Sequence, residues 1–248
     1  MSRPQAPTPG ASQRREFLGS LATGAALFVG GGALSNPLSA REPDGDLSAA
    51  ESPPADDSIA QPRRAWDMSW LDRLTGEHRQ VFDAPEIADG TILHQARTWM
   101  AGFAEVYSTS DADTNAVLVI RHNAVPMAIG DAVWARMEYG KEHDLKDPTS
   151  GKPAERNPFT NVASDDRHSI VWPDGTLDRL IERGAIVLVC NLATLRVVRQ
   201  VATKLKVPTD EARELVFNNM VPGTIHMPSG IFAVARAQEA GCHYIRAT

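Results

Sequence analysis

The 248-residue sequence is poor in cysteine and in positive charge, and each shortage excludes a class of protein. It has two cysteines, too few for the multi-disulfide framework that holds many small secreted domains together. Its 25 Lys and Arg residues stand against 31 Asp and Glu residues, which gives a net charge of −6. A chain of this charge, without a basic stripe, is not expected to bind nucleic acid or anionic lipid by non-specific electrostatics.

Several catalytic motifs are also missing from the sequence. There is no Gly-rich phosphate loop, no paired-cysteine metal motif, no Gly-x-Ser-x-Gly elbow and no His-Glu-x-x-His. Nucleotide-dependent enzymes and hydrolases of these types are therefore not expected, and the sequence indicates no cofactor and no metal. The cluster Glu142-His143-Asp144 lacks the ligand spacing of a known metal cage, and we interpret it as solvated surface.

The N-terminus has the pattern of an export signal. The segment Ser12-Gln13-Arg14-Arg15-Glu16-Phe17-Leu18 precedes a Gly- and Ala-rich apolar stretch and small residues up to Ala40. This order resembles a twin-arginine signal, although Gln13 separates the serine from the arginine pair, and the apolar stretch is too short to span a bilayer stably. We expect residues 1–40 to be read by the twin-arginine export machinery and removed. The mature protein is then periplasmic, without a stable membrane span.

The next segment, residues 41–65, is rich in Pro, Asp and Ser and contains too little apolar surface to bury, which predicts a disordered linker. Residues 66–248 are long enough for one domain with its own core. Within it, residues 140–174 contain no convincing periodic pattern, so we expect a long loop or insertion there.

Strand-like and helix-like patterns alternate through this domain. The strand-like runs are His78–Phe82, Ala116–Arg121, Ala185–Cys190, Val221–Met227 and Cys242–Arg246. The helical patterns are Ile92–Tyr107, Asp131–Tyr139, Leu177–Arg183, Leu192–Leu205, Asp210–Met220 and Ile231–Ala240, with Thr209 and Ser229 as expected N-caps. The alternation predicts an α/β fold, a three-layer sandwich around a mostly parallel central sheet of about five strands.

Cys190 is the most informative single residue because it stands where a predicted buried strand turns into a predicted helix. Open α/β sheets bind ligands at the carboxyl ends of their strands, and a helix N-terminus stabilises a thiolate. The alternative is that Cys190 is a small buried hydrophobic residue, as free cysteines commonly are. The segment itself leaves both interpretations open.

Two other segments resemble the DsrE/DsrF-like sulfur-relay family. The closing stretch has a short strand ending in Pro228-Ser229-Gly230, a helix with Arg236-Ala237-Gln238-Glu239-Ala240-Gly241 and a final strand Tyr244-Ile245-Arg246. Upstream, Val117-Leu118-Val119-Ile120-Arg121-His122 is similar to the family's second strand, with Asn123 where a glycine is common. The resemblance covers most of residues 79–246.

This resemblance implies that Cys190 takes the place of the cysteine that accepts sulfane sulfur as a persulfide, in a homo-oligomer that exchanges sulfur with a donor or acceptor protein. The expected function is therefore that of an exported sulfur carrier or sulfurtransferase. Some members of the family lack the cysteine, so the alternative is a non-catalytic oligomeric binding or assembly module in which Cys190 is structural.

His122 and His226 follow or end predicted strands and are candidates for proton acceptors or for stabilising the Cys190 anion. Each could instead be a structural histidine satisfied by a backbone hydrogen bond. We assign substrate or anion binding to the residues that flank these strand ends, namely Asn123, Asn191, Ser229 and Gly230. Cys242 begins the last strand and is expected to be structural. Parallel strands would hold it too far from Cys190 for a disulfide, whereas an antiparallel pairing would reopen that possibility.

Overall fold

The computed structural model describes residues 65–147, 150–165 and 170–248. The predicted export signal and the predicted linker up to residue 64 lie outside the described residues. The described residues belong to one compact unit, Ala60–Thr248. Within these ranges, no helix is both long and apolar enough to cross a bilayer.

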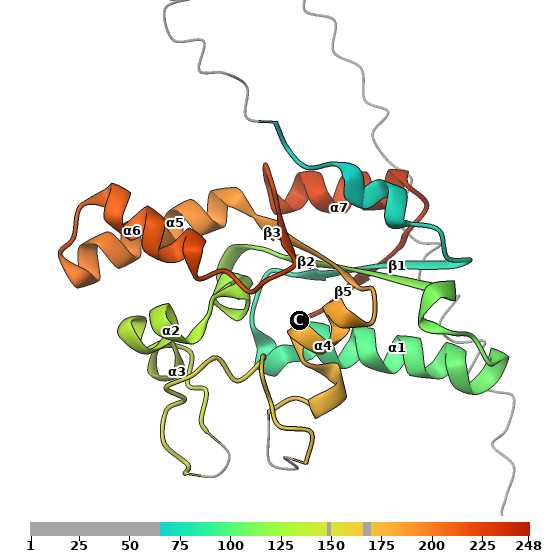
Figure 1. Cartoon of the computed structure of the whole chain (residues 1–248), viewed down its shortest axis with the longest axis horizontal. Coiled ribbons are helices and arrows are strands. Elements are labelled where there is room, and N and C mark those ends of the chain that lie inside the picture. The colour runs from blue at the N-terminus through green and yellow to red at the C-terminus, as the bar shows by residue number, and fades with distance from the viewer. Residues whose placement is uncertain (1–64, 148–149, 166–169) are drawn as a thin grey trace, which may run out of the picture. The chain divides into compact units, whose positions relative to one another are not determined.

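A single parallel sheet of five strands forms the centre of this unit, as the sequence predicts (Figure 1). The strands are β1 (His78–Ala84), β2 (Thr114–Ile120), β3 (Ile186–Cys190), β4 (Thr224–Met227) and β5 (His243–Arg246), in the spatial order β4-β3-β2-β1-β5. Every neighbouring pair is parallel. β2 and β3 are buried along their whole length, which explains why both appear in the sequence as continuous apolar runs.

Helices cover both faces of this sheet. They are α1 (Thr91–Tyr107), α2 (Asp131–Met137), α3 (Tyr139–Glu142), α4 (Leu177–Glu182), α5 (Asn191–Leu205), α6 (Thr209–Asn218) and α7 (Gly230–Glu239), together with short 3-10 turns such as η2 (Ser69–Arg73) and η5 (His122–Ala128). The larger core cluster contains buried residues of α1, α4, α5 and α6. The smaller cluster joins α7 and Trp70 of η2 to the other face. The arrangement is the expected three-layer sandwich.

The handedness of the connections decides which helix covers which face. The chain moves in one direction along the sheet from β1 to β4, and then returns across the whole sheet to β5. Right-handed crossovers in one direction place their helices on one face, and a right-handed crossover in the other direction places its helix on the opposite face. This explains why α7 alone among the crossover helices packs with η2 (Figure 1).

Two local predictions are wrong. The helix predicted over Asp131–Tyr139 is interrupted at Glu138, whose φ of 53° lies in the left-handed region and separates α2 from α3. Thr209 is the first residue of α6 and not its N-cap, because the helix starts directly after Pro208, whose ring fixes φ and leaves no backbone N–H. Ser229 does cap α7, since its Oγ accepts the N–H of Phe232 at 3.1 Å.

The segment 140–174 contributes to the core although little of its described part is regular. Leu145, Phe159 and Val171 are buried in the larger cluster. Asn157 fastens the segment to the preceding loop, because its Nδ2 donates to the carbonyl oxygens of Met127 and Ile129, both at 2.8 Å, and its Oδ1 accepts the N–H of Phe159 at 2.9 Å.

Replacing Asn157 by Ala removes three buried hydrogen bonds and leaves their backbone partners unsatisfied. We expect the free energy of unfolding to fall by about 2–4 kcal/mol. Urea denaturation followed by circular dichroism measures this loss. Asn218→Ala, at an exposed position at the end of α6, is the matched control, with an expected change below about 0.5 kcal/mol. Equal effects of the two substitutions would contradict this role of Asn157.

Candidate functional site

The connections that leave β3 and β4 go to opposite faces of the sheet. β3 leads into α5, which packs in the larger core cluster, whereas β4 leads into α7, which packs in the smaller one. In open α/β sheets, adjacent strands whose outgoing connections diverge in this way form a topological switch point, and ligands bind there beyond the carboxyl ends of the strands. Cys190 is the last residue of β3 and pairs with Met227 at the end of β4. The topology therefore places Cys190 at the switch point.

The thiol of Cys190 caps α5. Its Sγ accepts the N–H of Ala193 at 3.4 Å, and the carbonyl oxygen of Cys190 accepts the hydroxyl of Thr194 at 3.0 Å. The sulfur thus lies at the positive end of a 15-residue helix, where a negative charge is favoured. Cys190 is 7% exposed and belongs to the larger core cluster. Asn191, the first residue of α5, is buried directly beside it in the chain.

A row of polar side chains extends from Cys190 across the neighbouring strands. The β2–β3 register ends with Ile120 opposite Val189, so the next pair of positions is Arg121 and Cys190. The N–H of Arg121 donates to the carbonyl of Ala84 at 3.0 Å, which keeps Arg121 beside β1 as well. Arg121 is therefore held between the strand that ends in Cys190 and the strand that carries Asp83.

Arg121 and Asp83 form a two-point ion pair. Nε of Arg121 lies 2.6 Å from Oδ1 of Asp83, and Nη2 lies 2.9 Å from Oδ2. The Asp83 side chain is only 4% exposed and the Arg121 side chain 23%. The hydroxyl of Tyr244, on β5, donates to Oδ2 of Asp83 at 3.0 Å. The hydrogen bond to Asp83 is the main reason that the pKa of Arg121 is raised; desolvation by burial opposes this rise, and the charge of Asp83 adds to it.

The N-terminus of α7 presses on Arg121. A Cβ added to Gly230 would lie 2.6 Å from Cδ of Arg121, so only glycine fits here beside the stem of the arginine. Gly230 and the capping Ser229 thus lie at the switch point, and Gly230 lies against Arg121. The sequence predicts an anion-binding role for both Ser229 and Gly230. The structure gives Gly230 a steric role beside the arginine.

Arg121, Asp83 and Tyr244 were not assigned to the site from the sequence. Their pairing joins residues 38 and 161 positions apart, so no local pattern reveals it. The sequence does contain one signal for this pair. Asp83 stands in the otherwise apolar end of β1, and Arg121 directly follows the apolar run of β2. Charged side chains at such positions need partners if they are buried.

His122 and Asn123 follow Arg121 and contact Glu86, in the segment between β1 and α1. Nδ1 of His122 is 3.4 Å from Oε1 of Glu86, and the His122 side chain is 54% exposed. Nδ2 of Asn123 donates to the same oxygen at 3.2 Å, while Oδ1 of Asn123 accepts a hydrogen bond from Arg196 at 2.9 Å. His122 has a φ of 51°, in the left-handed region.

His226 is on the other side of β4 from Met227. It pairs with Val189, a member of the larger cluster, and its ring centre is 5.0 Å from that of Phe217, which packs against the same cluster. Met227, the register partner of Cys190, belongs to the smaller cluster. The structure therefore places the His226 ring against Phe217 of α6.

Cys242 lies at the opposite end of the sheet from Cys190. It immediately precedes β5, whereas Cys190 ends β3, and all strands are parallel. Both cysteines are free. Burial raises the pKa of the Cys242 thiol to about 11. Cys242 is therefore a second buried, free thiol remote from Cys190 and a useful internal reference for it.

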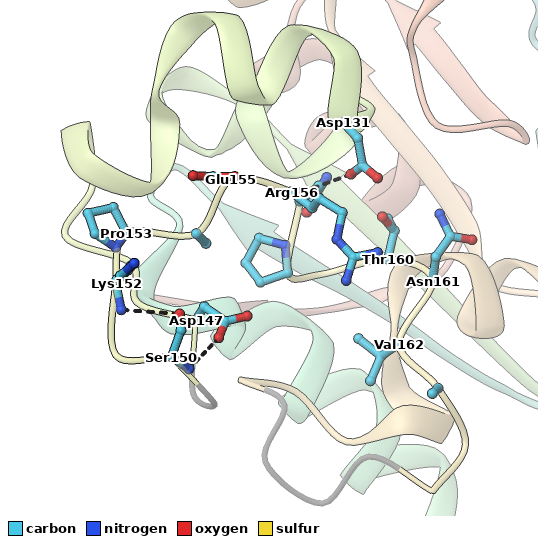
Figure 2. A pocket seen from close by; sticks show the side chains of 14 residues that line it. Asp131, Asp147, Ser150, Lys152, Pro153, Glu155, Arg156, Thr160, Asn161 and Val162 are labelled. Carbon is cyan, nitrogen blue, oxygen red and sulfur yellow. Dashed lines mark hydrogen bonds between the residues drawn. The ribbon is translucent and has the colours of Figure 1, made fainter.

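A separate polar pocket of about 690 Å³ lies between the start of α2 and the segment 150–163 (Figure 2). Its wall includes Asp131, which accepts the N–H of Asn157 at 2.9 Å, and Arg156, which reaches toward Thr160. None of the residues assigned from the sequence lines it. In the described part of the chain, no group of three or more His, Cys, Asp or Glu residues is arranged to hold a metal ion.

Comparisons with known proteins add little to this geometry. No family model matches the sequence, and no curated protein matches it. Among solved structures, a protein of unknown function from Methanobacterium thermoautotrophicum, MTH1491, is similar at 14% sequence identity and a TM-score of 0.36, over 68% of this chain and 98% of that chain. None of these comparisons shows membership of the DsrE/DsrF-like family.

The close approach of α7 to Arg121 predicts a strong effect of a single methyl group. Gly230→Ala places a Cβ within 2.6 Å of Arg121 Cδ, so we expect it to lower the free energy of unfolding by about 1–3 kcal/mol. Gly102→Ala in α1 is the control, since a Cβ there meets nothing within 4 Å, and it should stabilise by about 0.5–1 kcal/mol. Urea denaturation of both variants checks the signs. A neutral Gly230→Ala would show that the packing beside Arg121 is loose.

Proposed function

We propose that this chain is an exported protein of the DsrE/DsrF-like type that carries sulfane sulfur on Cys190. The observation that supports this most strongly is the place of the thiol: Cys190 Sγ accepts a backbone N–H at the start of α5, at the switch point of a parallel α/β sheet. A sulfur carrier needs a thiolate, a surrounding that stabilises negative charge and a route for the donor. The first two needs have candidates at this position.

The proposed reaction is a transfer between sulfur atoms. The Cys190 thiolate attacks the outer sulfur of a donor persulfide, R–S–SH, and the electron pair of the broken S–S bond leaves with the donor as R–S⁻. The products are Cys190–S–SH and the donor thiolate, so no external oxidant or reductant is needed. The same step in the reverse direction passes the sulfur to an acceptor thiolate. Capping by the Ala193 N–H favours the anionic sulfur in both directions.

Apolar side chains around the thiol support exchange with a partner protein. Leu192 in the first turn of α5 is 62% exposed, and Ile231 and Phe232 in the first turn of α7 are 65% and 37% exposed. These turns follow the two strand ends that meet at Cys190. Exposed apolar residues that gather beside a candidate site are typical of a protein-binding surface. We propose that the donor or acceptor is a protein, and that the chain forms a homo-oligomer.

The alternative function is that of a non-catalytic binding or assembly module. It is favoured by one observation, namely that Cys190 is only 7% exposed and already has a structural task as the cap of α5. A buried capping thiol needs no reactivity to be useful to the fold. The two functions differ in a single measurable property, the ability of Cys190 to take up sulfur.

Incubation of the purified protein with polysulfide, followed by intact mass measurement, tests the carrier function. We expect an adduct of about 32 Da, one sulfur atom, which a reducing agent removes. Cys190→Ser should lose the adduct, while Cys242→Ser keeps it, because the Cys242 thiol has a pKa near 11 and remains protonated at neutral pH. A wild type that takes up no sulfur, or an adduct that maps to Cys242, would favour the assembly module.

The export proposal has its own test. Replacing Arg14 and Arg15 by Lys keeps the charge but removes the arginine pair that the export machinery recognises. We expect the fraction of protein found in the periplasm to fall about tenfold or more, and the precursor to accumulate in the cytoplasm. Fractionation with immunodetection measures this ratio. Export of the Lys-Lys variant at the level of the wild type would contradict a twin-arginine signal.

A further inference from the structure

The polar pocket beside the start of α2 has the size of a small-molecule site. Its volume of about 690 Å³ is within the range of roughly 300–1,000 Å³ that ligand pockets occupy. No residue of the five strands lines it, so it is separate from the switch point at Cys190. Side chains of both signs line it, namely Lys152 and Arg156 as cations and Asp131, Asp147 and Glu155 as anions.

One end of this pocket brings together groups that can recognise a ligand. Figure 2 shows Asp131, Thr160 and Asn161 gathered there, with the guanidinium of Arg156 directed toward Thr160. Lys152 and the other aspartate of the pocket lie at the opposite end. A cation, an anion, a hydroxyl and an amide therefore face the same part of the pocket.

The two charges at this end have no ionic partner within the protein. Oδ1 of Asp131 accepts the backbone N–H of Asn157 at 2.9 Å, which leaves its second oxygen available. Neither Asp131 nor Arg156 takes part in an ion pair within the described ranges. A ligand with a single charge would be attracted by one of these side chains and repelled by the other. A ligand that carries both charges satisfies both side chains.

The hydroxyl of Thr160 is a third available group. Thr160 is only 7% exposed, and it lines the pocket. Among the described residues its hydroxyl has no hydrogen-bond partner, and it is not one of the polar atoms that are sealed from solvent. The small exposed part of this side chain therefore opens to the pocket. A polar group placed in this way in a cavity wall is typical of a site that orients a ligand.

The wall that carries these groups is held in place at several points. Asn157 is fastened to the loop before α2 by its side-chain hydrogen bonds. The carbonyl oxygen of Phe159 accepts the N–H of Leu177 at 2.9 Å, and the N–H of Asn161 donates to Oδ1 of Asp178 at 3.1 Å. A ligand that binds to a wall fixed in this way loses less free energy to the ordering of the loop.

We propose that this pocket binds a free α-amino acid with an apolar side chain. Arg156 and the hydroxyl of Thr160 bind the carboxylate, and Asp131 and the side-chain oxygen of Asn161 bind the ammonium group. Both ligand charges are attached to one carbon atom, so a zwitterion reaches the two opposite charges at one end of the pocket.

The rest of the pocket wall suits an apolar side chain. Its uncharged apolar residues are Pro153, Ala154, Pro158, Val162 and Ala163. Ligand pockets are commonly lined in this way, with a few polar groups that fix the orientation of the ligand. The pocket is large enough for side chains up to the size of leucine or phenylalanine.

Isothermal titration calorimetry with L-leucine as the probe tests the proposal on the purified protein. We expect one site per chain. Two analogues separate the two charges, since isoamylamine is leucine without its carboxylate and isocaproate is leucine without its ammonium group. Each analogue should bind at least about tenfold more weakly than L-leucine, because it loses charge-assisted hydrogen bonds. This series requires no variant of the protein.

Variants then assign each ligand charge to its residue. Arg156→Met should weaken L-leucine binding at least about tenfold and leave isoamylamine binding unchanged, because this analogue has no carboxylate to lose. Asp131→Asn keeps an oxygen for the N–H of Asn157 and should weaken L-leucine but not isocaproate. Arg199→Met is the control, since Arg199 is an exposed arginine of α5 outside this pocket, and it should bind all three probes as the wild type does. Circular dichroism verifies that the variants are folded.

Three results would overturn the proposal. The first is that L-alanine, L-valine, L-leucine and L-phenylalanine, each tested up to about 10 mM, all fail to bind. The second is an analogue that binds as tightly as L-leucine. The third is unchanged L-leucine binding in folded Arg156→Met, which would place the ligand elsewhere. Cys190 takes no part in this site, so this titration and the sulfur-uptake experiment can succeed or fail independently.

Discussion

The handedness of the strand connections is the constraint on which the site depends. From β1 to β4 the chain moves in one direction, and right-handed crossovers place α1, α5 and α6 on one face. The return to β5 must then place α7 on the other face. Because β3 and β4 are neighbours whose outgoing helices diverge, the sheet is left with a switch point at Cys190. The location of the thiol thus follows from chain direction, without any special property of the cysteine.

The same topology explains why an ion pair is retained in this part of the core. A buried Arg–Asp pair loses hydration from both ions, so it is a weak source of stability compared with apolar packing. Asp83 is nevertheless 3% exposed and accepts hydrogen bonds from Arg121 and Tyr244. Gly230 leaves space for the arginine stem at the start of α7. Arg121 and Tyr244 together give both carboxylate oxygens of Asp83 a hydrogen-bond donor, which a buried carboxylate requires.

Local patterns in the sequence predict the fold well and the site only in part. The strands are found within three residues at each end because β2 and β3 are buried on both faces and form uninterrupted apolar runs. Cys190 can be predicted for the same reason, because it stands between a strand pattern and a helix pattern.

The row from Arg121 to Tyr244 cannot be predicted from local patterns, because pairing across strands is decided by tertiary structure. His226 shows the same limit: a strand-end position was visible, but its face follows from the register that pairs it with Val189. The break at Glu138 depends on a left-handed backbone in a non-glycine residue, which propensities do not reveal.

The central claim is that Cys190, although buried, is a reactive thiol and Cys242 is not. The most direct measurement is the ratio of their alkylation rates in the folded wild-type protein at pH 7, compared with the ratio in denaturant. The account predicts that Cys190 is labelled at least about tenfold faster than Cys242 in the folded state, because its sulfur accepts a backbone N–H at a helix N-terminus whereas burial raises the pKa of Cys242 to about 11. The ratio should approach one in denaturant. Equal protection of both thiols until the protein unfolds would contradict the account.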